Sequence, residues 1–356
     1  MKNRFLSYKF IDASGNLRDK IIRKTRGRLK PSWFDGSSFG FMPTNNSDLM
    51  LEPDKKSLHF DPIRMMASYF CFLRKADGYK LETDFRRNAF DTMDEDEETR
   101  GALFGVEPEF FICKRKAGIL IPIDVDDKFD LKDEKQTKWY GCLPPIDSFQ
   151  NLRYEIANAL EAAGLYIEGI HHEVAPGQCE FSWKCANLLK TCDQMMLYKY
   201  IVTNVCAKYE LEAVWEAKPF QHLNGNGCHV HQSLPMMKPF RRFDTNQVDS
   251  RKDIIEKYAQ GLVNHYDELL EACCVGKSSL DRLVPGFEAP TKDNNGFGVA
   301  DRTKTVRIPG GGGRVEFRLP DPDMNPYIAL PMMLRFGYES VRQQRKPNNT
   351  EGDKAE

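Results

Sequence analysis

Two histidines and a serine alternate along residues 228–233, directly after a turn rich in Asn and Gly. His229, His231 and Ser233 are separated by single residues. Successive side chains of a strand point to opposite faces, so these three are expected to line one face, spaced by about 7 Å. A face that carries two imidazoles and a hydroxyl can hold a ligand or a metal ion once other strands supply partners.

Two glutamates occupy alternate positions of an apolar segment at residues 106–112. Glu107 and Glu109 therefore share one face of a predicted strand, and the residues around them indicate that this strand is buried. Buried carboxylates are costly unless a cation or hydrogen-bond donors compensate them, which favours a site over a solvent-facing surface. Pro108 lies between the two and, because it lacks an amide hydrogen, predicts an edge position or a bulge.

Further charged side chains come from two later segments. Glu173 and Glu180 flank a Pro-Gly turn. Residues 314–319 alternate between charged and apolar types, so Arg314, Glu316 and Arg318 are expected on the face opposite the core. The glycine run at 310–313 that precedes them predicts a flexible hairpin turn.

The combined set contains five carboxylates, one or two histidines and several arginines. Oxygen ligands favour the hard divalent ions Mg²⁺ and Mn²⁺, and an added imidazole leans toward Mn²⁺. The cysteines and histidines do not occur at the spacings of a structural zinc site. Carboxylate-bound metals beside arginines suggest phosphoryl transfer, because both neutralise charge on a transferring phosphate.

Composition excludes several other classes of protein. The 356 residues are 41% hydrophobic and 29% charged, with a net charge of −1, so no global field attracts nucleic acid or a membrane surface. We find no apolar run long enough to span a bilayer and no signal-peptide pattern. The ten cysteines show no disulfide framework, and we expect a cytoplasmic protein with free thiols. A nucleotide P-loop at 276–278 is rejected, because Glu271 stands where its first glycine is required.

The remaining patterns predict the elements that position these groups. Residues 8–16 read as a strand that enters a hairpin, and helical periodicity covers 151–163, 187–213, 250–274 and a last helix that ends near 343. The acidic segment 91–100 predicts a domain boundary, and the polar tail 346–356 predicts disorder.

At this point six segments, in this order, make the sequence resemble the glutamine synthetase family. They are FDGSS at 34–38, EPEFF at 107–111, HHEVAPGQ at 171–178 with Glu180, NGNGCH at 224–229, RLVPGFEAP at 282–290, and RVEFR at 314–318 running into NPY at 325–327. Each motif is weak alone, but six in order are specific. The resemblance covers roughly residues 8–335.

The resemblance implies an α+β protein of two domains. An N-terminal β-grasp domain would occupy residues 1–95, and a catalytic domain of the glutamine synthetase/guanido kinase type, with a curved antiparallel sheet flanked by helices, would occupy 96–356. The active site would be a funnel between subunits of a ring-shaped homo-oligomer, a decamer or a dodecamer. The implied reaction is ATP-dependent condensation of L-glutamate with ammonia through γ-glutamyl phosphate, with two or more Mg²⁺ or Mn²⁺ ions at each site.

Roles are implied for individual residues by position in the motifs. One metal ion would be held by Glu109, Glu173 and Glu180, and a second by Glu107, His229 and Glu316. Glutamate would be bound by Asn224, Gly225, Arg282 and Arg318. ATP would contact Glu168, His231, Ser233, Arg307 and Arg314, while Arg302 would steady the transferring phosphate. Asp35 of the neighbouring subunit, with Tyr140 and Glu173, would form the ammonium site, and Glu288 would lie on the flap that closes over the intermediate.

The chain departs from the class I enzymes of the family in the segment between Arg307 and Glu316. That segment is short, and the glycine run stands where class I enzymes place an ATP-contacting lysine. Two alternatives stay open: a γ-glutamyl ligase that uses a polyamine or methylamine-type acceptor, and a non-catalytic structural relative. The presence of both Asp35 and Tyr140 favours ammonia as the acceptor, and the complete set of metal-ligand positions argues against a non-catalytic protein.

Overall fold

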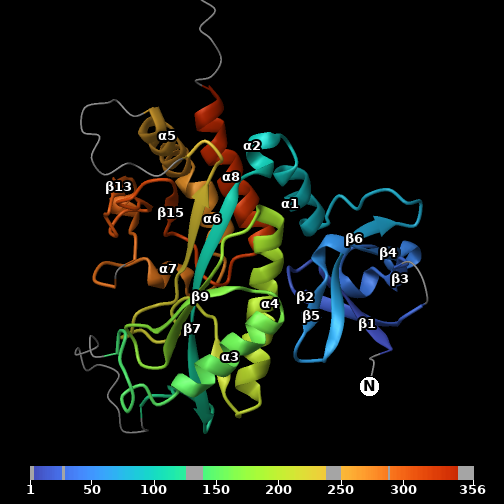
Figure 1. The fold of residues 1–356 in the computed structure, drawn as a ribbon, viewed down its shortest axis with the longest axis horizontal. Helices are drawn as coiled ribbons and strands as arrows, with labels where there is room; N and C mark the ends of the chain where they lie inside the picture. Colours follow the sequence, from blue (N-terminus) through green and yellow to red (C-terminus); the bar gives the residue numbers. More distant parts are fainter. Residues whose placement is uncertain (1–3, 26–28, 126–138, 238–249, 288, 344–356) are drawn as a thin grey trace, which may run out of the picture.

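The computed structural model describes residues 4–25, 29–125, 139–237, 250–287 and 289–343. Within these residues the chain forms a smaller N-terminal sheet domain, at the right of Figure 1, and a larger domain of sheet and helices at the left. The expected α+β architecture is confirmed. The tail 346–356 lies outside the described residues.

The N-terminal domain is a mixed sheet. Its strands are β1 (Phe5–Ile11), β2 (Leu17–Arg23), β3 (Ser32–Asp35), β4 (Asp48–Pro53), β5 (His59–Asp61) and β6 (Met66–Lys75), with 3-10 turns at Ser37–Phe39, Thr44–Asn46 and Lys55–Ser57. The order is β2-β1-β6-β4-β3, with β5 paired to β6, and β1 runs parallel to β6. The predicted strand and hairpin at 8–16 are confirmed by β1 and β2, whose turn contains Gly15 at a φ of +84°. The domain has its own small core, which includes Tyr8, Phe10 and Leu51.

The larger domain is organised around one long strand, β7 (Leu103–Lys116). The other strands are β8 (Ile119–Pro122), β9 (Ile167–His172), β10 (Gln178–Trp183), β11 (Glu212–Val214), β12 (Cys228–Ser233), β13 (Phe297–Val299), β14 (Val306–Ile308) and β15 (Val315–Phe317). Their order is β13-β14-β15-β12-β7-β10-β9, and β8 and β11 also pair with β7. Every described pair except β13–β14 is antiparallel. The predicted hairpin at the glycine run is confirmed, because it joins the antiparallel strands β14 and β15.

Helices cover one face of this sheet. They are α1 (Phe85–Met93), α2 (Glu97–Arg100), α3 (Gln150–Ala162), α4 (Leu188–Ala207), α5 (Ser250–Asn264), α6 (Tyr266–Cys273), α7 (Ser279–Arg282) and α8 (Pro326–Arg342), with a 3-10 turn at Lys292–Asn294. Figure 1 shows α4 between β7 and the N-terminal domain, and α4 packs against both β7 and α8. No helix among the described residues is both long enough and apolar enough to cross a bilayer.

Strand β7 explains why acidic side chains face away from the helices. Phe104, Val106 and Phe110 are buried in the core that α4 completes, whereas Glu107 and Glu109 alternate with them on the opposite face. The period of two therefore separates an apolar face, which packs on helices, from a polar face that is available for a site.

Pro108 does not lie on an edge strand, because β7 is the central strand of its sheet, but the predicted irregularity is present in the pairing of β7 with β10. Pro108 pairs with Cys228 of β12, while pairing with β10 begins only at Glu109, opposite Glu180. The Glu109 amide points toward β12 and donates to Gly227 O at 2.9 Å. Successive amides point to opposite edges, so the missing N–H of Pro108 falls on the β10 side. There the ladder is interrupted between the Glu109–Glu180 pair and the Phe104–Ala186 bridge, which differ in register by one residue.

The acidic segment 91–100 forms the end of α1 and all of α2. Asp96 caps α2 through a capping box with Thr99. Helix α1 packs against α8 and α4 of the larger domain. The boundary at residue 95 stays a prediction.

Candidate metal and substrate site

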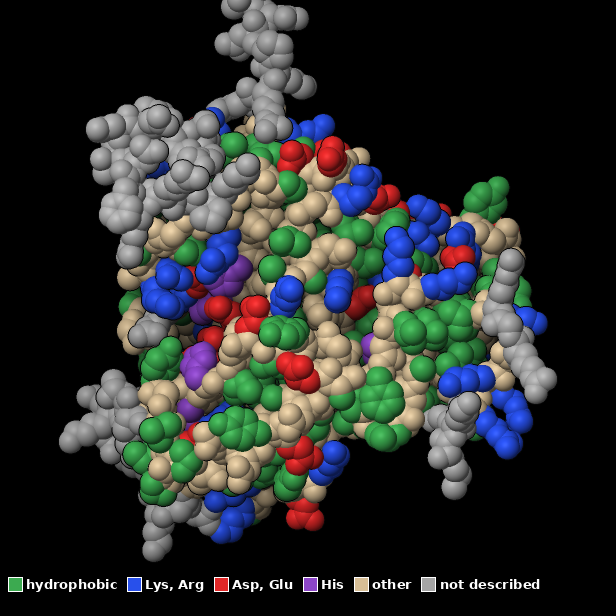
Figure 2. Space-filling view, viewed as in Figure 1, with side chains coloured by type: hydrophobic (Ala, Val, Ile, Leu, Met, Phe, Trp, Pro, Cys, Tyr) green, Lys and Arg blue, Asp and Glu red, His purple; other side chains and the backbone are tan. Residues whose placement is uncertain are grey.

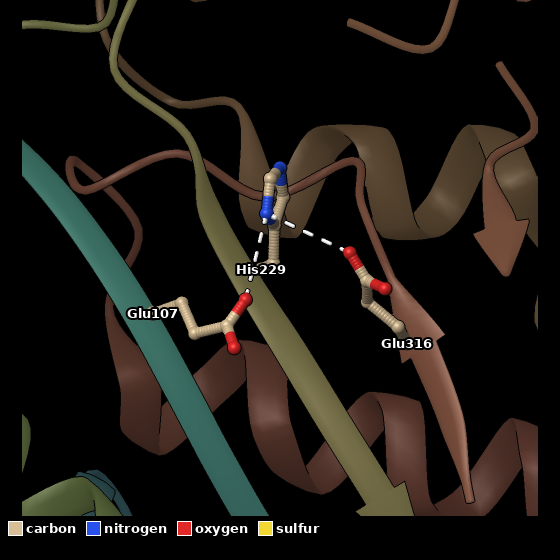
Figure 3. A group of neighbouring side chains, drawn as sticks. All are labelled: Glu107, His229 and Glu316. Atoms are coloured by element: carbon tan, nitrogen blue, oxygen red, sulfur yellow. Dashed lines mark ion pairs between the residues drawn. The ribbon is translucent and has the colours of Figure 1, made fainter. Parts of the chain in front are cut away.

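Three adjacent strands bring an imidazole between two carboxylates. Glu107 of β7 is directly opposite His229 of β12, and Glu316 of β15 is opposite His231. His229 Nδ1 lies 3.9 Å from Glu107 Oε2 and 3.7 Å from Glu316 Oε1, and Figure 3 shows the three side chains converging from their three strands. One donor atom from each lies within 4.8 Å of the others, so this trio could hold a metal ion.

Two further groups of possible ligand atoms continue from this trio. Glu109, Glu180 and His229 form one of them, and His171, Glu173 and Glu180 form the other. The two groups share Glu180, which lies on β10 opposite Glu109. The predicted trio of Glu109, Glu173 and Glu180 is thus distributed over two neighbouring groups, and its assignment to one ion stays a prediction. We call the five residues Glu107, Glu109, Glu173, Glu180 and Glu316 the acidic cluster.

His171 belongs to the same group of side chains, although no role was predicted for it. Its Nε2 lies 2.6 Å from Glu173 Oε1 and 3.7 Å from Glu180 Oε1. Its ring contacts Tyr140 edge to face, at 5.4 Å between centroids. The signal was its place in the HHEVAPGQ motif, two residues before Glu173, which puts both on one face if the strand continues.

Like charges dominate one half of the acidic cluster. Burial, followed by the charge of Glu173, raises the pKa of Glu109 to about 8. Burial, followed by the charges of Glu109 and Glu107, raises the pKa of Glu180 to about 10. Such shifts mean that the negative charge of these carboxylates is poorly compensated by the protein itself.

Positive groups compensate the other half. Burial alone would raise the pKa of Glu316, but the charges of His229 and Arg318 lower it to about 2. Glu316 accepts hydrogen bonds from Arg318 Nη1 at 2.5 Å and from Arg307 Nη1. For Glu107, hydrogen bonds with His229 and His231 outweigh the effect of burial and lower the pKa.

The residues present fit a divalent cation. The donor set is carboxylate oxygen with one imidazole, which suits Mg²⁺ or Mn²⁺. The raised pKa values of Glu109 and Glu180 supply an independent argument, because a bound cation would favour their ionised forms.

A cavity of about 580 Å³ lies over the acidic cluster. Figure 2 shows acidic, histidine and basic side chains gathered at the left of this face of the molecule. Besides Glu107, Glu109, Glu173, Glu180 and His229, the predicted residues that line the cavity are Tyr140, Asn224, Gly225, Arg282, Arg302 and Arg318. Residues predicted for metal and for glutamate therefore share one cavity, and Glu316 contacts His229 and Arg318 of its lining.

The turn before β12 shapes the wall of the cavity that contains Asn224 and Gly225. A Cβ added at Gly225 would lie 2.4 Å from Ala217 O and 2.7 Å from Arg282 Cγ, so no side chain fits there. Gln178, which also lines the cavity, donates from Nε2 to Gly225 O at 3.0 Å and to Glu109 Oε2 at 3.1 Å. Gln178 was not predicted as a site residue, and it ties the turn to the acidic cluster.

The residues predicted for ATP lie outside the wall of the cavity. His231 Nε2 lies 3.1 Å from Glu107 Oε1, and its Nδ1 accepts from Arg314 Nε at 3.1 Å. Arg307 pairs with Glu316 from β14. Ser233 ends β12, and Glu168 is exposed on β9. None of these residues is among the described residues that line the cavity.

Two predicted catalytic residues are not found at this cavity. Asp35 is exposed at the end of β3. Figure 1 shows β3 at the far right, well away from β7 and β9. Hydrogen bonds from Ser38 and Ser37 lower its pKa, so the carboxylate stays ionised. Glu288 lies outside the described residues, although its neighbours Phe287 and Ala289 line the cavity.

Comparison with known proteins gives the same answer for both domains. The family model described as "Glutamine synthetase, beta-Grasp domain" matches residues 2–75, and the one described as "Glutamine synthetase, catalytic domain" matches residues 85–355.

Individual relatives carry the same name. The chain is 34% identical over 362 residues to the glutamine synthetase of Methanococcus voltae, with 96% of this chain and 78% of that protein covered. The identity is 32% to that of Methanocaldococcus jannaschii (96% and 77% covered) and 33% to that of Thermus thermophilus (88% and 71% covered).

Proposed function

This chain belongs to the glutamine synthetase family, and from that premise we propose that it condenses L-glutamate with ammonia at the expense of ATP, through γ-glutamyl phosphate. Membership in the family supports an ATP-dependent ligase. The observation that carries the finer proposal is the single cavity in which the acidic cluster faces Arg282, Arg302 and Arg318. Carboxylates for divalent ions and guanidiniums for anionic substrates are the two sets of groups that phosphoryl transfer to a carboxylate requires.

We assign the metal ligands as predicted from the motifs, and we add His171, which lies with Glu173 and Glu180, as a further possible ligand. Glu107, His229 and Glu316 would hold one ion, and Glu109, Glu173 and Glu180 the other. When bound, the ions would neutralise charge on the phosphates of ATP and on the phosphoryl group in transfer. The high pKa of Glu180, about 10, and its position between two groups of ligand atoms make it the residue most dependent on a bound cation.

The substrate glutamate would be held by the guanidiniums and by the turn at 224–225. Arg282 is buried and donates to the carbonyls of Leu319 and Pro320, which fixes its direction. Arg318 is fixed by Glu316. Rigid guanidiniums of this kind bind carboxylates with defined geometry, so the γ-carboxylate can be aligned with the terminal phosphate of ATP, where Arg302 would stabilise the developing charge.

The second half of the reaction needs an ionised carboxylate to bind ammonium and accept its proton. We assign this role to Tyr140 and Glu173 of one subunit with Asp35 of a neighbouring subunit in a ring-shaped homo-oligomer. Asp35 suits the binding of the cation because hydrogen bonds from the Ser38 and Ser37 hydroxyls lower its pKa and keep it ionised. Exclusion of water from the cavity would protect the acyl phosphate from hydrolysis.

The test is an acceptor panel with the purified full chain. We expect Mg²⁺-dependent release of ADP and phosphate with glutamate and ammonium, with one amide formed per ATP, and weaker turnover with methylamine or polyamines. Glu316→Ala should reduce the rate severely, because it removes a ligand from the cluster. Turnover with amines alone would establish an amine ligase instead, and no ADP release with any acceptor would establish a non-catalytic relative.

Asp35 is tested by separating the two half-reactions. Asp35→Ala should reduce amide formation more than phosphorylation of glutamate, which is followed as ammonia-independent phosphate release. Equal loss of both half-reactions would contradict its role at the ammonium site.

A further inference from the structure

The loop between β9 and β10 decides where Glu173 lies. Glu173 N donates to Gln178 O at 2.9 Å, which closes the loop at residues 173–178. Gln178, at the other end, donates to Glu109 Oε2 at 3.1 Å. Any movement of this loop therefore moves Glu173 relative to Glu109 and Glu180.

A carboxylate on the far side of the loop holds both of its ends. The side chain of Asp124, just after β8, is fully buried. Its Oδ2 accepts from Gly177 N at 2.8 Å and lies 2.9 Å from His172 Nε2. Its Oδ1 accepts from the exposed Ser148 hydroxyl at 3.0 Å. One oxygen thus contacts the residue before Glu173 and the residue before Gln178.

His172 completes the connection to the backbone of Glu173. Its Nδ1 lies 2.7 Å from Glu173 O, and its Nε2 faces Asp124. The ring is buried and stacks on Trp139, with centroids 5.7 Å apart and planes 18° apart. The imidazole is therefore a rigid bridge from a buried carboxylate to the main chain of a residue in the acidic cluster.

We propose that Asp124 and His172 are positioning residues that hold Glu173 where it can bind a divalent cation together with Glu180 and His171. The inference rests on the proposed function in so far as Glu173 is taken as a metal ligand. Neither residue lines the cavity among the described residues, so they act through the loop. Groups that orient metal ligands from behind affect metal affinity by about 10–100-fold when they are removed.

Asp124→Asn is the first variant, and Ser148→Ala is its matched control. The amide oxygen can still accept from His172 and Gly177, but it lacks the negative charge that strengthens both contacts, whereas Ser148→Ala removes the third contact of Asp124 and leaves its charge and the loop intact. We expect Asp124→Asn to weaken Mg²⁺ and Mn²⁺ binding by about 10–100-fold, measured by calorimetric titration of the full chain without substrates. Ser148→Ala should stay within about threefold of the unaltered protein.

His172→Gln covers the case in which Asp124→Asn does not fold. The longer amide retains a donor toward Asp124, so no buried carboxylate is left without a partner, but it loses the contact with Glu173 O. We expect the same loss of metal affinity with a normal far-UV spectrum, and a KM for glutamate within about threefold, because Arg282 and Arg318 are untouched. The double variant should be no weaker than either single variant, because the two residues act in series.

Metal binding by folded His172→Gln or Asp124→Asn that equals that of the unaltered protein would overturn the proposal. Because the titration uses no glutamate, ATP or ammonium, it decides the roles of Asp124 and His172 even if the acceptor panel shows no turnover. Loss of turnover with every acceptor, alongside normal metal binding by the unaltered chain, would count against the proposed function alone.

Discussion

Two buried groups of carboxylates in this molecule are compensated in opposite ways. We call Asp54, Arg86, Asp193 and Tyr327 the junction cluster, because it links the N-terminal domain to α1, α4 and α8. There Arg86 donates to Asp193 at 2.9 and 2.7 Å and to Asp54 at 2.9 Å, and Tyr327 donates to Asp193 at 2.6 Å. Burial alone would lower the pKa of Arg86, but the charge of Asp193 raises it above its usual value.

Within the described part of the chain, Glu109 and Glu180 are compensated less well, because the charges of Arg282 and Arg318 only partly offset the effect of burial on Glu109. Arg318 and Arg307 donate to Glu316, and Arg282 donates to main-chain carbonyls. Accordingly the pKa of Glu109 is raised to about 8 and that of Glu180 to about 10. This difference in charge compensation indicates that the junction cluster stabilises the fold, whereas the acidic cluster is suited to bind a cation.

The largest effect on stability is expected at the junction cluster. Arg86→Met leaves Asp54 and Asp193 buried without their cation, and breaking a buried ion pair by removing one partner costs roughly 3–5 kcal/mol. Equilibrium urea unfolding followed by circular dichroism measures this loss. Asp193→Asn added to Arg86→Met should recover part of it, because the amide still accepts from Tyr327 and removes one unpaired charge. A loss under about 1 kcal/mol would show that the cluster is not held by this pair.

A substitution in the acidic cluster should raise the stability of the metal-free protein and lower its metal-dependent activity. Glu180→Gln removes the free-energy cost of keeping this carboxyl group buried among like charges, so the metal-free protein should gain about 1 kcal/mol, or roughly 1–2 °C in Tm for a chain of this length. Metal-dependent turnover should fall about 10–100-fold, because a ligand is weakened. Thermal unfolding in a chelator and the rate at saturating Mg²⁺ measure the two effects. A variant that loses stability in chelator would contradict the idea that Glu180 is poorly compensated.

Periodicity predicted much of what positions the acidic cluster. The alternation of apolar and charged residues in 106–112 and 228–233 predicted the strands and the faces of Glu107, Glu109 and His229 correctly, and the structure places β15, β12 and β7 side by side. At Pro108 the sequence indicated an edge or an irregularity in the ladder, but it did not reveal that only the pairing with β10 is interrupted. Here β10 stops pairing at Glu109, so a central strand tolerates a proline.

Contacts between residues far apart in the chain could not be predicted. Asp124 and His172 are 48 positions apart, and Arg86 and Asp193 are 107 positions apart. No periodicity connects such pairs, and each residue alone reads as an ordinary polar side chain. His171 shows a different limit. Its motif was evident, but whether its ring turns toward Glu173 or away depends on the course of the loop that follows β9.

Removal of divalent ions should make stability depend on pH in a defined direction. The pKa values of Glu109 and Glu180, about 8 and about 10 in the fold, lie above the ordinary value of a glutamate near 4.3, so the metal-free folded state binds more protons than the unfolded state. Stability in chelator is therefore highest below that ordinary value and falls as pH rises through 8 and toward 10.

With saturating Mg²⁺ the fall should be smaller, because the ionised carboxylates gain a cation. Tm measured between pH 6 and 9 with chelator and with Mg²⁺ tests this, and Glu180→Gln should flatten the chelator curve. Parallel curves under the two conditions would mean that the acidic cluster does not bind the ion.

The smallest effect on stability is expected for an arginine–carboxylate ion pair at the surface. Arg335 of α8 contacts Glu95 at 3.0 Å, but the side chains are 53% and 41% exposed. Water and salt screen such a pair, and its contribution is about 0–1 kcal/mol. Arg335→Ala should therefore change the urea midpoint little, and the change should vanish in about 0.5 M salt, where the Debye length is only about 4 Å. A loss of unfolding free energy close to that of Arg86→Met would contradict the view that burial determines how much an ion pair stabilises this protein.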